Sequence, residues 1–203
     1  MNNKVLLINP PFNIAKENYD SSLSVGLLSI ATYLDSRGVK VKILDGAREK
    51  NFWPCLKKEI LESDCAGLSV MTTQVPGALK ISRLIRKIKP TCLIVWGGAH
   101  PTFFPVETIG HDLVDIAVYG EGEETFYEIA SSRNLSEING ILYKQAEKII
   151  KNPPRALNNP ATMSLFNWRL VSPEVLDKLY LIPSLTSRGC PHRCTFCINA
   201  ILQ

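Results

Sequence analysis

Three cysteines near the end of the sequence have the spacing of a metal site. Cys190, Cys194 and Cys197 follow the pattern C-x3-C-x2-C. Cysteine thiolates are the ligands of iron–sulfur clusters, and ferredoxin-type clusters use four of them. Three thiolates can hold three irons of a [4Fe–4S] cluster and leave the fourth iron open to an external ligand. The spacing therefore predicts a cluster that binds and reduces a small molecule.

Zinc and disulfides are the alternative uses of these cysteines. Structural zinc sites take four Cys or His ligands, commonly in two separated pairs. Only His192 is near enough in sequence to be a fourth ligand, and it lies inside the first cysteine gap. Disulfides are disfavoured by the odd number of cysteines in the group. Zinc therefore stays open as the alternative.

The composition is that of a folded protein with a hydrophobic core. Of the 203 residues, 45% are hydrophobic and 21% are charged, and the formal net charge is +4. This charge is too small and too dispersed to predict a nucleic-acid partner. The apolar run at residues 5–8 is too short for a signal peptide or a membrane span. We therefore expect a cytoplasmic protein with reduced cysteines and no membrane span.

Apolar runs alternate with helix-like segments from residue 4 to about 131. A continuous apolar run such as 5–8 is typical of a strand buried on both faces of a parallel sheet. The expected strands are 5–8, 39–44, 66–71, 92–96 and 115–118, and the expected helices are 24–37, 51–62, 76–88 and a segment that ends at 131. This repeat predicts an α/β fold with a doubly wound parallel sheet of five strands, Rossmann-like or flavodoxin-like.

The pattern changes after residue 131, which predicts a short C-terminal extension. We expect a small hairpin at 140–150, a linker at 152–160, a helical turn at 173–179 and a further strand at 181–186. The expected parts are a ligand-binding domain at 1–135, a hairpin and linker at 136–180, and the start of another domain at 181–203.

The ligand of an open α/β sheet binds beyond the carboxyl ends of its strands, where strand order reverses. The residues expected there are Asn9, Pro10, Ser69, Thr72, Thr73, Gln74, Gly97, Gly98, His100, Gly120, Glu121, Gly122 and Glu123. Structural roles stay open for several of them, because a Gly-Gly pair can form a tight turn and carboxylates suit a helix N-terminus. A dinucleotide is disfavoured, since the turn after the first strand contains two prolines where a glycine-rich turn is needed.

Two short motifs at these strand ends resemble the cobalamin (vitamin B12)-binding domain. Ser69-Val70-Met71 and Gly97-Gly98 match the S-x-L and Gly-Gly parts of its pattern, with Met71 in place of Leu. The D-x-H-x-x-G part is missing, because residues 9–12 read Asn-Pro-Pro-Phe and offer no histidine to cobalt. This departure is typical of cobalamin-binding domains fused to radical S-adenosylmethionine (SAM) barrels. The small residues would leave a channel for the nucleotide tail of the cofactor.

The cysteine motif resembles the signature of radical SAM enzymes, including Phe196 before the last cysteine. The resemblances cover about residues 4–131 and 181–203, and they imply a B12-dependent radical SAM enzyme of the methyltransferase or cyclase type. The implied cofactors are cobalamin, a [4Fe–4S] cluster on the three cysteines, and SAM. A small-molecule substrate would bind in a barrel that this sequence barely begins, so we expect the chain alone to be inactive. The alternatives are a stand-alone cobalamin carrier or sensor, and one half of a split radical SAM enzyme.

Overall fold

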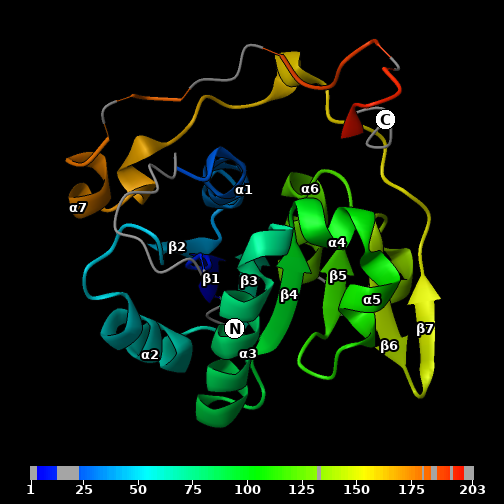
Figure 1. The fold of residues 1–203 in the computed structure, drawn as a ribbon, viewed down its shortest axis with the longest axis horizontal. Helices are drawn as coiled ribbons and strands as arrows, with labels where there is room; N and C mark the ends of the chain where they lie inside the picture. Colours follow the sequence, from blue (N-terminus) through cyan, green and yellow to red (C-terminus); the bar gives the residue numbers. More distant parts are fainter. Residues whose placement is uncertain are drawn as a thin grey trace.

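A mixed sheet forms the centre of the computed structural model, which describes residues 4–12, 23–131, 134–179, 181–183, 187–192 and 194–198 (Figure 1). Within these ranges the sheet has seven strands in the order β2-β1-β3-β4-β5-β6-β7. They are β1 (Lys4–Asn9), β2 (Lys40–Asp45), β3 (Cys65–Ser69), β4 (Leu93–Gly97), β5 (Ile116–Val118), β6 (Ile141–Gln145) and β7 (Lys148–Lys151). The first five are parallel, and their order is the flavodoxin-like one. The doubly wound α/β fold is therefore confirmed.

The expected count of five strands is wrong, because the hairpin of β6 and β7 joins the sheet. β6 pairs antiparallel with β5, where Ile141 lies opposite Val118, and β7 pairs antiparallel with β6. Ile141 and the next residue, Leu142, are both 0% exposed. Two adjacent apolar side chains point to opposite faces of a strand, so burying both requires cover on both faces. Ile141 packs in the core on the side of α1 and α6, and Leu142 packs in the core on the side of α2, α3 and α5.

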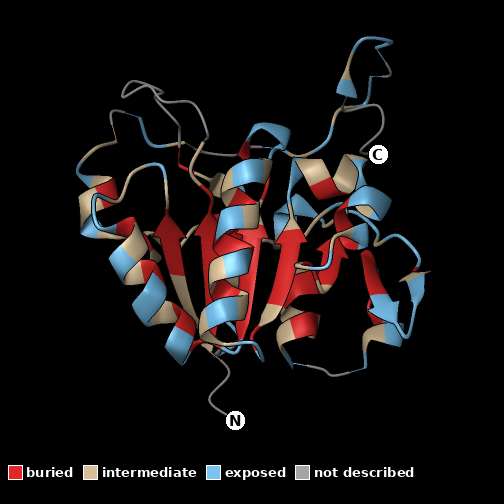
Figure 2. Ribbon diagram, turned by 60° about the horizontal axis from the view of Figure 1, so that its bottom comes forward, coloured by how far each residue is buried: buried red, intermediate tan, exposed pale blue. Residues whose placement is uncertain are grey.

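Helices cover both faces of the sheet, as right-handed crossovers require. α1 (Val25–Asp35) and α6 (Glu123–Ser131) pack on one face, and α2 (Phe52–Glu62), α3 (Val75–Ile88) and α5 (Pro105–Gly110) pack on the other. Val5 and Leu7 of β1 belong to the first core, whereas Leu6 and Ile8 belong to the second. This alternation follows from the two-residue period of a strand. Strands β1, β3, β4 and β5 are buried over most of their length, whereas β7 at the edge is largely exposed (Figure 2).

Two short helices that were not expected from the sequence follow β3 and β4. The 3₁₀-helix η1 (Thr72–Gln74) connects β3 to α3, and α4 (Ala99–Phe103) follows β4. The end of α1 is as expected, with Gly38 at a φ of +75° and the Val39 N–H donating to the Leu34 carbonyl over 3.1 Å. A glycine at this position ends a helix because it adopts the left-handed conformation without steric cost.

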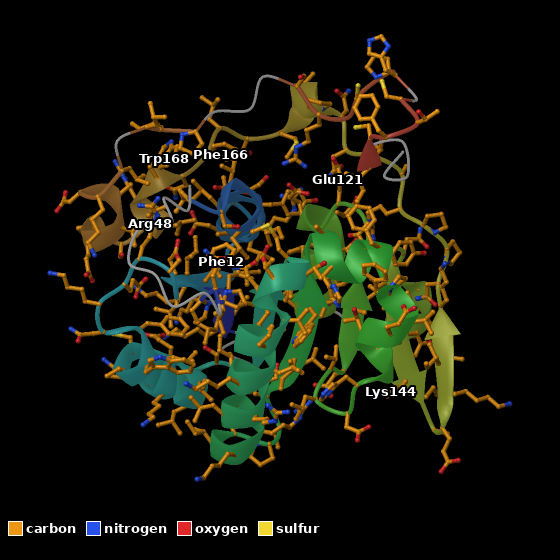
Figure 3. The ribbon with its side chains drawn as sticks, viewed as in Figure 1. Phe12, Arg48, Glu121, Lys144, Phe166 and Trp168 are labelled. Atoms are coloured by element: carbon orange, nitrogen blue, oxygen red, sulfur yellow. The ribbon has the colours of Figure 1, made fainter. Side chains whose placement is uncertain are left out.

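After β7 the chain returns along the α1 and α6 side of the sheet (Figure 1). Arg155 forms ion pairs with two carboxylates of α6, and the Asn167 N–H donates to Thr32 Oγ1 of α1 over 2.9 Å. The rings of Phe166 and Trp168 lie edge to face with centroids 6.2 Å apart, and both pack against the core beneath α1 (Figure 3). The expected linker is therefore held against the domain.

The helical turn expected at 173–179 is α7 (Pro173–Leu176), and the chain beyond it returns to the carboxyl edge of the sheet. Of the strand expected at 181–186, residues 184–186 lie outside the described residues, and 181–183 are not in a strand. In the part of the chain that the structure describes, no helix is both long enough and apolar enough to cross a membrane.

Candidate functional site

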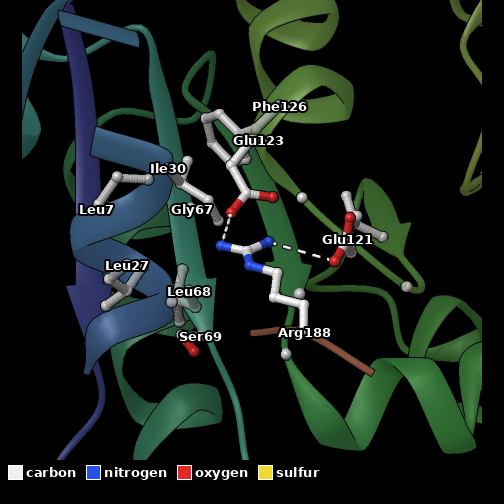
Figure 4. A pocket seen from close by; sticks show the side chains of 16 residues that line it. Leu7, Leu27, Ile30, Gly67, Leu68, Ser69, Glu121, Glu123, Phe126 and Arg188 are labelled. Carbon is white, nitrogen blue, oxygen red and sulfur yellow. Dashed lines mark hydrogen bonds and ion pairs between the residues drawn. The ribbon is translucent and has the colours of Figure 1, made fainter. Parts of the chain in front are cut away.

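A cavity of about 250 Å³ lies between the carboxyl half of the sheet and helices α1 and α6 (Figure 4). Its lining is apolar on the sheet and helix sides and charged at one end. The lining residues are Leu7, Gly26, Leu27, Ile30, Gly67, Leu68, Ser69, Gly97, Gly98, Val118, Gly120, Glu121, Gly122, Glu123, Phe126 and Arg188. We call this space the cavity. It lies at the edge where an open α/β sheet of this strand order binds its ligand.

Small residues in register on neighbouring strands leave space for the cavity. Ser69 of β3 pairs with Gly97 of β4, and Gly67 pairs with Leu7 of β1. A Cβ atom on Gly67 would overlap Cε2 of Phe126, so the phenylalanine ring lies where a side chain would be. A Cβ atom on Gly97 would meet only Val118, at 3.7 Å. Gly67 therefore lets α6 approach the sheet, and Gly97 keeps the cavity open.

Gly98 has a backbone role as well as a place in the lining. Its φ is +94°, and a Cβ atom there would lie 2.9 Å from the Val70 nitrogen. The chain bends tightly here, since the Val70 N–H donates to the Gly97 carbonyl over 2.8 Å and the His100 N–H donates to the Val70 carbonyl over 2.9 Å. Glycine is the residue that such a left-handed, crowded position favours. The tight turn and the cavity wall are thus formed by the same residue.

Four residues form a charged cluster at the mouth of the cavity, and we call it the rim cluster: Ser29, Glu121, Glu123 and Arg188. Arg188 Nη2 donates to Glu123 Oε1 over 2.6 Å and to Ser29 Oγ over 2.9 Å, and Nη1 donates to Glu121 Oε1 over 3.3 Å. Ser29 Oγ donates in turn to Glu123 Oε1 over 2.6 Å. Figure 4 shows the guanidinium of Arg188 between the two glutamates. The cluster joins α1, the start of α6 and the segment before the cysteines.

The charges of the rim cluster stabilise one another. Burial by itself would raise the pKa of Glu123, whose side chain is 4% exposed, but the hydrogen bonds from Arg188 and Ser29 outweigh burial and lower it. Burial opposes the charge of Arg188 as well, and the hydrogen bond and charge of Glu123 keep its pKa raised. The pair is therefore ionised at neutral pH. Both charges lie mostly away from solvent, where hydrogen bonds to ions are strong.

Seven of the residues expected at the ligand site line the cavity, and six do not. The seven are Ser69, Gly97, Gly98, Gly120, Glu121, Gly122 and Glu123. The six are Asn9, Pro10, Thr72, Thr73, Gln74 and His100, which lie at the same edge of the sheet but bond elsewhere or face solvent.

Asn9 and Gln74 belong to a buried polar cluster with Asp45, which we call the Gln74 cluster. Gln74 Nε2 donates to Asn9 Oδ1 over 2.8 Å and to the Pro10 carbonyl over 2.6 Å, and Asn9 Nδ2 donates to Asp45 Oδ1 over 3.1 Å. All three side chains are nearly inaccessible, with residue exposures of 6% for Asn9, 2% for Asp45 and 1% for Gln74. Burial raises the pKa of Asp45, although the Ala47 N–H and Asn9 oppose this shift.

The two prolines after β1 are held between neighbouring elements. A Cβ atom on Gly46 would lie 2.7 Å from Pro11 Cδ, and one on Gly77 would lie 2.5 Å from the Pro11 carbonyl oxygen. The turn therefore packs against the end of β2 and the first turn of α3. Together with Gln74, these contacts give the segment after β1 a structural role.

Thr72 and His100 form a second, more exposed pair. Thr72 Oγ1 and His100 Nδ1 are 3.2 Å apart, and the imidazole lies 5.3 Å from the ring of Phe104. Partial burial lowers the pKa of His100, while Glu107 acts in the opposite direction. The neutral imidazole is thus favoured at neutral pH. Thr73, the next residue after Thr72, is exposed.

No disulfide involves the three cysteines of the C-x3-C-x2-C motif in the part of the chain that the structure describes. Cys190 and Cys197 are partly exposed, Cys194 is exposed, and the Cys197 N–H donates to the Cys194 carbonyl over 3.0 Å. Among the described residues, no three His, Cys, Asp or Glu side chains are grouped so that they could hold a metal ion. The cysteine site expected from the sequence therefore stays a prediction.

Several residues of the cavity were not expected from the sequence. They are Leu7, Gly26, Leu27, Ile30, Gly67, Leu68, Val118, Phe126 and Arg188. A signal existed for Gly67, because it is two residues before Ser69 in the same strand and therefore on the same face. Arg188 is two residues before Cys190, but its partners are 65, 67 and 159 residues away in sequence. Nothing in its local sequence indicates that contact.

The chain resembles known proteins along most of its length. An uncharacterized methyltransferase of Pyrococcus horikoshii is 30% identical over 98% of this chain and 46% of its own length. The anaerobic magnesium-protoporphyrin IX monomethyl ester cyclase of a Synechocystis strain is 28% identical over 96% of this chain and 42% of its own length. The chain thus spans less than half the length of these two relatives.

A solved structure has the same fold. It is that of the radical S-adenosylmethionine methyltransferase TsrM from Kitasatospora setae with cobalamin and a [4Fe–4S] cluster bound, and it matches 81% of this chain and 31% of that chain with a TM-score of 0.65 and 21% identity. The sequence profile of the B12 binding domain matches residues 19–130, a range that includes α1 to α5, all but the last residue of α6, and strands β2 to β5. This range contains fourteen of the sixteen residues that line the cavity, all except Leu7 and Arg188, and the chain belongs to the B12-binding domain family.

Proposed function

We propose that this chain binds cobalamin with the nucleotide tail of the cofactor in the cavity, as part of a B12-dependent radical SAM enzyme of the methyltransferase or cyclase type. The observation that carries the proposal is the glycine-lined cavity at the carboxyl ends of β3 and β4, inside the range matched by the B12 binding domain. Its contacts would come from Ser69, Gly97 and Gly98 on the sheet, and from residues 120–123 at the start of α6.

The size and lining of the cavity fit one part of cobalamin. Sites for whole small molecules measure about 300–1,000 Å³, and this cavity measures about 250 Å³. It therefore suits the narrow nucleotide tail, while the corrin ring would lie outside at the edge of the sheet. Leu7, Leu27, Ile30 and Phe126 give an apolar wall of the kind that an aromatic base requires. When bound, cobalamin supplies the group-carrier and redox chemistry, and the protein orients it and shields it from water.

We further propose that Cys190, Cys194 and Cys197 hold a [4Fe–4S] cluster whose open iron binds SAM. The support is the cysteine spacing, together with the cobalamin and [4Fe–4S] cluster named for the TsrM structure. In this proposal residues 1–135 are the cobalamin domain, 136–180 connect it, and 181–203 begin the radical SAM domain. The small-molecule substrate would bind in the part of the relatives' length that this chain does not span.

The test of the first proposal is a titration of the purified chain with hydroxocobalamin. We expect one corrinoid per chain, seen as a change in the visible spectrum and as co-elution in gel filtration. If the chain retains a flavin or a nucleotide stoichiometrically and no corrinoid, the proposal is wrong.

The test of the second proposal is anaerobic reconstitution with iron and sulfide. We expect four irons per wild-type chain at most, held weakly, and none on a variant in which the three motif cysteines are replaced by serine. Cys55→Ser is the matched control, because Cys55 is partly exposed and lies on α2, away from the motif. Stoichiometric zinc without iron uptake would favour the zinc alternative.

A further inference from the structure

Arg188 is the residue that connects the cavity with the segment that carries the cysteines. It precedes Cys190 by two residues, and its side chain is part of the cavity lining. The side chain is 18% exposed, compared with 16% for Glu121 and 4% for Glu123. Ion pairs on a protein surface contribute little because water screens them. The pairs of Arg188 are mostly shielded and combine three hydrogen bonds, so they specify one position of the guanidinium.

Arg188 also lines a second cavity. This space of about 440 Å³ lies between residues 152–170, which we call the return segment, and the chain after α7, and its lining includes Met163, Phe166, Trp168 and Ile182 in addition to Arg188. Arg188 is therefore a shared wall of two cavities. Ser29, Glu121 and Glu123 hold its guanidinium by hydrogen bonds on one side, and the second cavity lies on the other.

Other donors to Glu123 explain why the contact can change without unfolding the domain. Ser29 Oγ donates to Glu123 Oε1 over 2.6 Å, and Asn158 Nδ2 donates to Glu123 Oε2 over 3.1 Å. Glu121 likewise accepts from the Asn158 N–H over 2.5 Å. Both carboxylates keep a hydrogen-bond donor when Arg188 is absent. None of the rim-cluster residues belongs to the hydrophobic core between the sheet and helices α1 and α6.

We propose that Arg188 is a positioning residue that couples the occupancy of the cavity to the position of the cysteine segment. A ligand in the cavity contacts the aliphatic part of the Arg188 side chain only when Arg188 is bonded to Ser29, Glu121 and Glu123. We call the segment at 187–192 docked when these bonds are formed. Binding therefore favours the docked segment, and by thermodynamic reciprocity the docked segment strengthens binding by the same factor. This inference rests on the proposed function, since the ligand is cobalamin.

The experiment measures both directions of the coupling in the full chain without iron. Cyanocobalamin is the probe, because its upper ligand keeps it from reacting with thiols. One measurement is the rate at which cyanocobalamin leaves the protein after dilution. The other is the rate of Cys190 alkylation by iodoacetamide, with and without cyanocobalamin, determined by mass spectrometry. Cys55 serves as the internal reference thiol.

The expected result is a slower alkylation of Cys190 in wild type when cyanocobalamin is present, and no such protection in Arg188→Ala. We expect release of cyanocobalamin to be about tenfold faster in Arg188→Ala, as the loss of charge-assisted hydrogen bonds implies. Arg188→Lys should give intermediate values, because lysine keeps the charge but lacks the planar fork that meets two glutamates at once. Arg169→Ala is the matched control, since Arg169 is an exposed arginine of the return segment that does not line the cavity.

The outcomes separate this inference from the proposed function. If wild type does not bind cyanocobalamin, the proposed function fails. If wild type binds it while Cys190 alkylation is unchanged and release from Arg188→Ala is as slow as from wild type, the coupling is refuted and the binding proposal stands. If Arg188→Ala unfolds, the comparison of wild type with Arg188→Lys and with Glu121→Gln still decides, because each of these two variants weakens the contact of Arg188 while Glu123 keeps its hydrogen bonds from Ser29 and Asn158.

Discussion

Two parts of the carboxyl edge of the sheet carry polar or small residues, and they are built differently. In the first part β3 ends in Ser69, β4 ends in Gly97, and Gly120 and Gly122 follow β5; a cavity lies between these residues and helices α1 and α6. Over β1 and β2 the strands end in Asn9 and Asp45, and these side chains bond to each other and to Gln74. The first part has space next to it. The second part uses its polar groups internally.

The difference shows that position at the carboxyl edge is a necessary feature of a ligand site but is not sufficient. A buried polar group that already has its hydrogen bonds gains nothing from a ligand, because it would exchange one partner for another. A cavity wall of glycine and apolar side chains gains buried surface from any ligand that fits. Cofactor affinity should therefore depend on the cavity, and folding stability should depend on the Gln74 cluster.

The largest effect is expected when the cavity is filled by a side chain. In Gly97→Leu the new Cβ atom would lie 3.7 Å from the Cβ of Val118, and the rest of the side chain would project into the cavity. We expect the affinity for cyanocobalamin to fall by about 10- to 100-fold, because the leucine side chain would overlap the bound cofactor and the surrounding structure would have to shift to relieve that overlap. The measurement is an equilibrium titration followed in the visible spectrum.

The control for this change is Gly110→Leu at the end of α5, where a new Cβ atom would meet nothing within 4 Å. It should bind cyanocobalamin as wild type does. Equal affinity of Gly97→Leu and wild type would show that the cofactor does not use the cavity. The difference between the two parts of the edge would then have no bearing on cofactor binding.

The next effect concerns stability and should leave binding intact. Gln74→Ala removes the donor to Asn9 Oδ1 and to the Pro10 carbonyl, in a cluster that is almost completely buried. We expect the free energy of unfolding to fall by about 1–3 kcal/mol, the usual cost of unpaired buried polar groups. Urea denaturation measures this change, and Thr73→Ala is the control because Thr73 is exposed. A loss of cyanocobalamin affinity in a folded Gln74→Ala protein would contradict the division of roles.

The parallel sheet and the edge that carries the cavity could be predicted from the sequence, because continuous apolar runs and Gly-Gly or Gly-Glu-Gly-Glu turns are local signals. That the β6–β7 hairpin pairs with β5 could not be predicted, because a hairpin pattern in a sequence indicates the turn between its two strands but not the strand beside them. The same limit applies to the cavity. Gly67 lies on the same face of β3 as Ser69, so its place in the lining could be predicted from the sequence. Phe126 and Arg188 reach the cavity from distant segments, so theirs could not.

A smaller effect is expected from the charge of Asp45. Burial raises the pKa of its carboxyl in the folded protein, so the folded state binds this proton more tightly than the unfolded state does. Acidification from the raised pKa toward the ordinary value of 3.8 should therefore stabilise the wild type relative to Asp45→Asn. The measurement is urea denaturation of both proteins at a series of pH values. A stability difference that moves the other way on acidification would show that hydrogen bonds from Asn9 and Ala47 outweigh burial.

The smallest effect is expected at His100. Among the residues that the structure describes, it is the one histidine near the ends of β3, β4 and β5. Its Nδ1 is 3.2 Å from Thr72 Oγ1, its ring contacts Phe104, and it does not line the cavity. The segment after β1 offers no histidine either, because residues 9–12 are Asn, Pro, Pro and Phe. His100→Ala should therefore change the affinity for cyanocobalamin by less than about twofold, well below the change expected for a lost hydrogen bond to a charged group.

The decisive measurement for His100 is electron paramagnetic resonance of the Co(II) form, in which an axial nitrogen ligand gives a characteristic splitting. We expect a spectrum without such splitting in both proteins. A nitrogen splitting in wild type that disappears in His100→Ala would assign a cobalt ligand to α4 and would extend the cofactor site beyond the cavity.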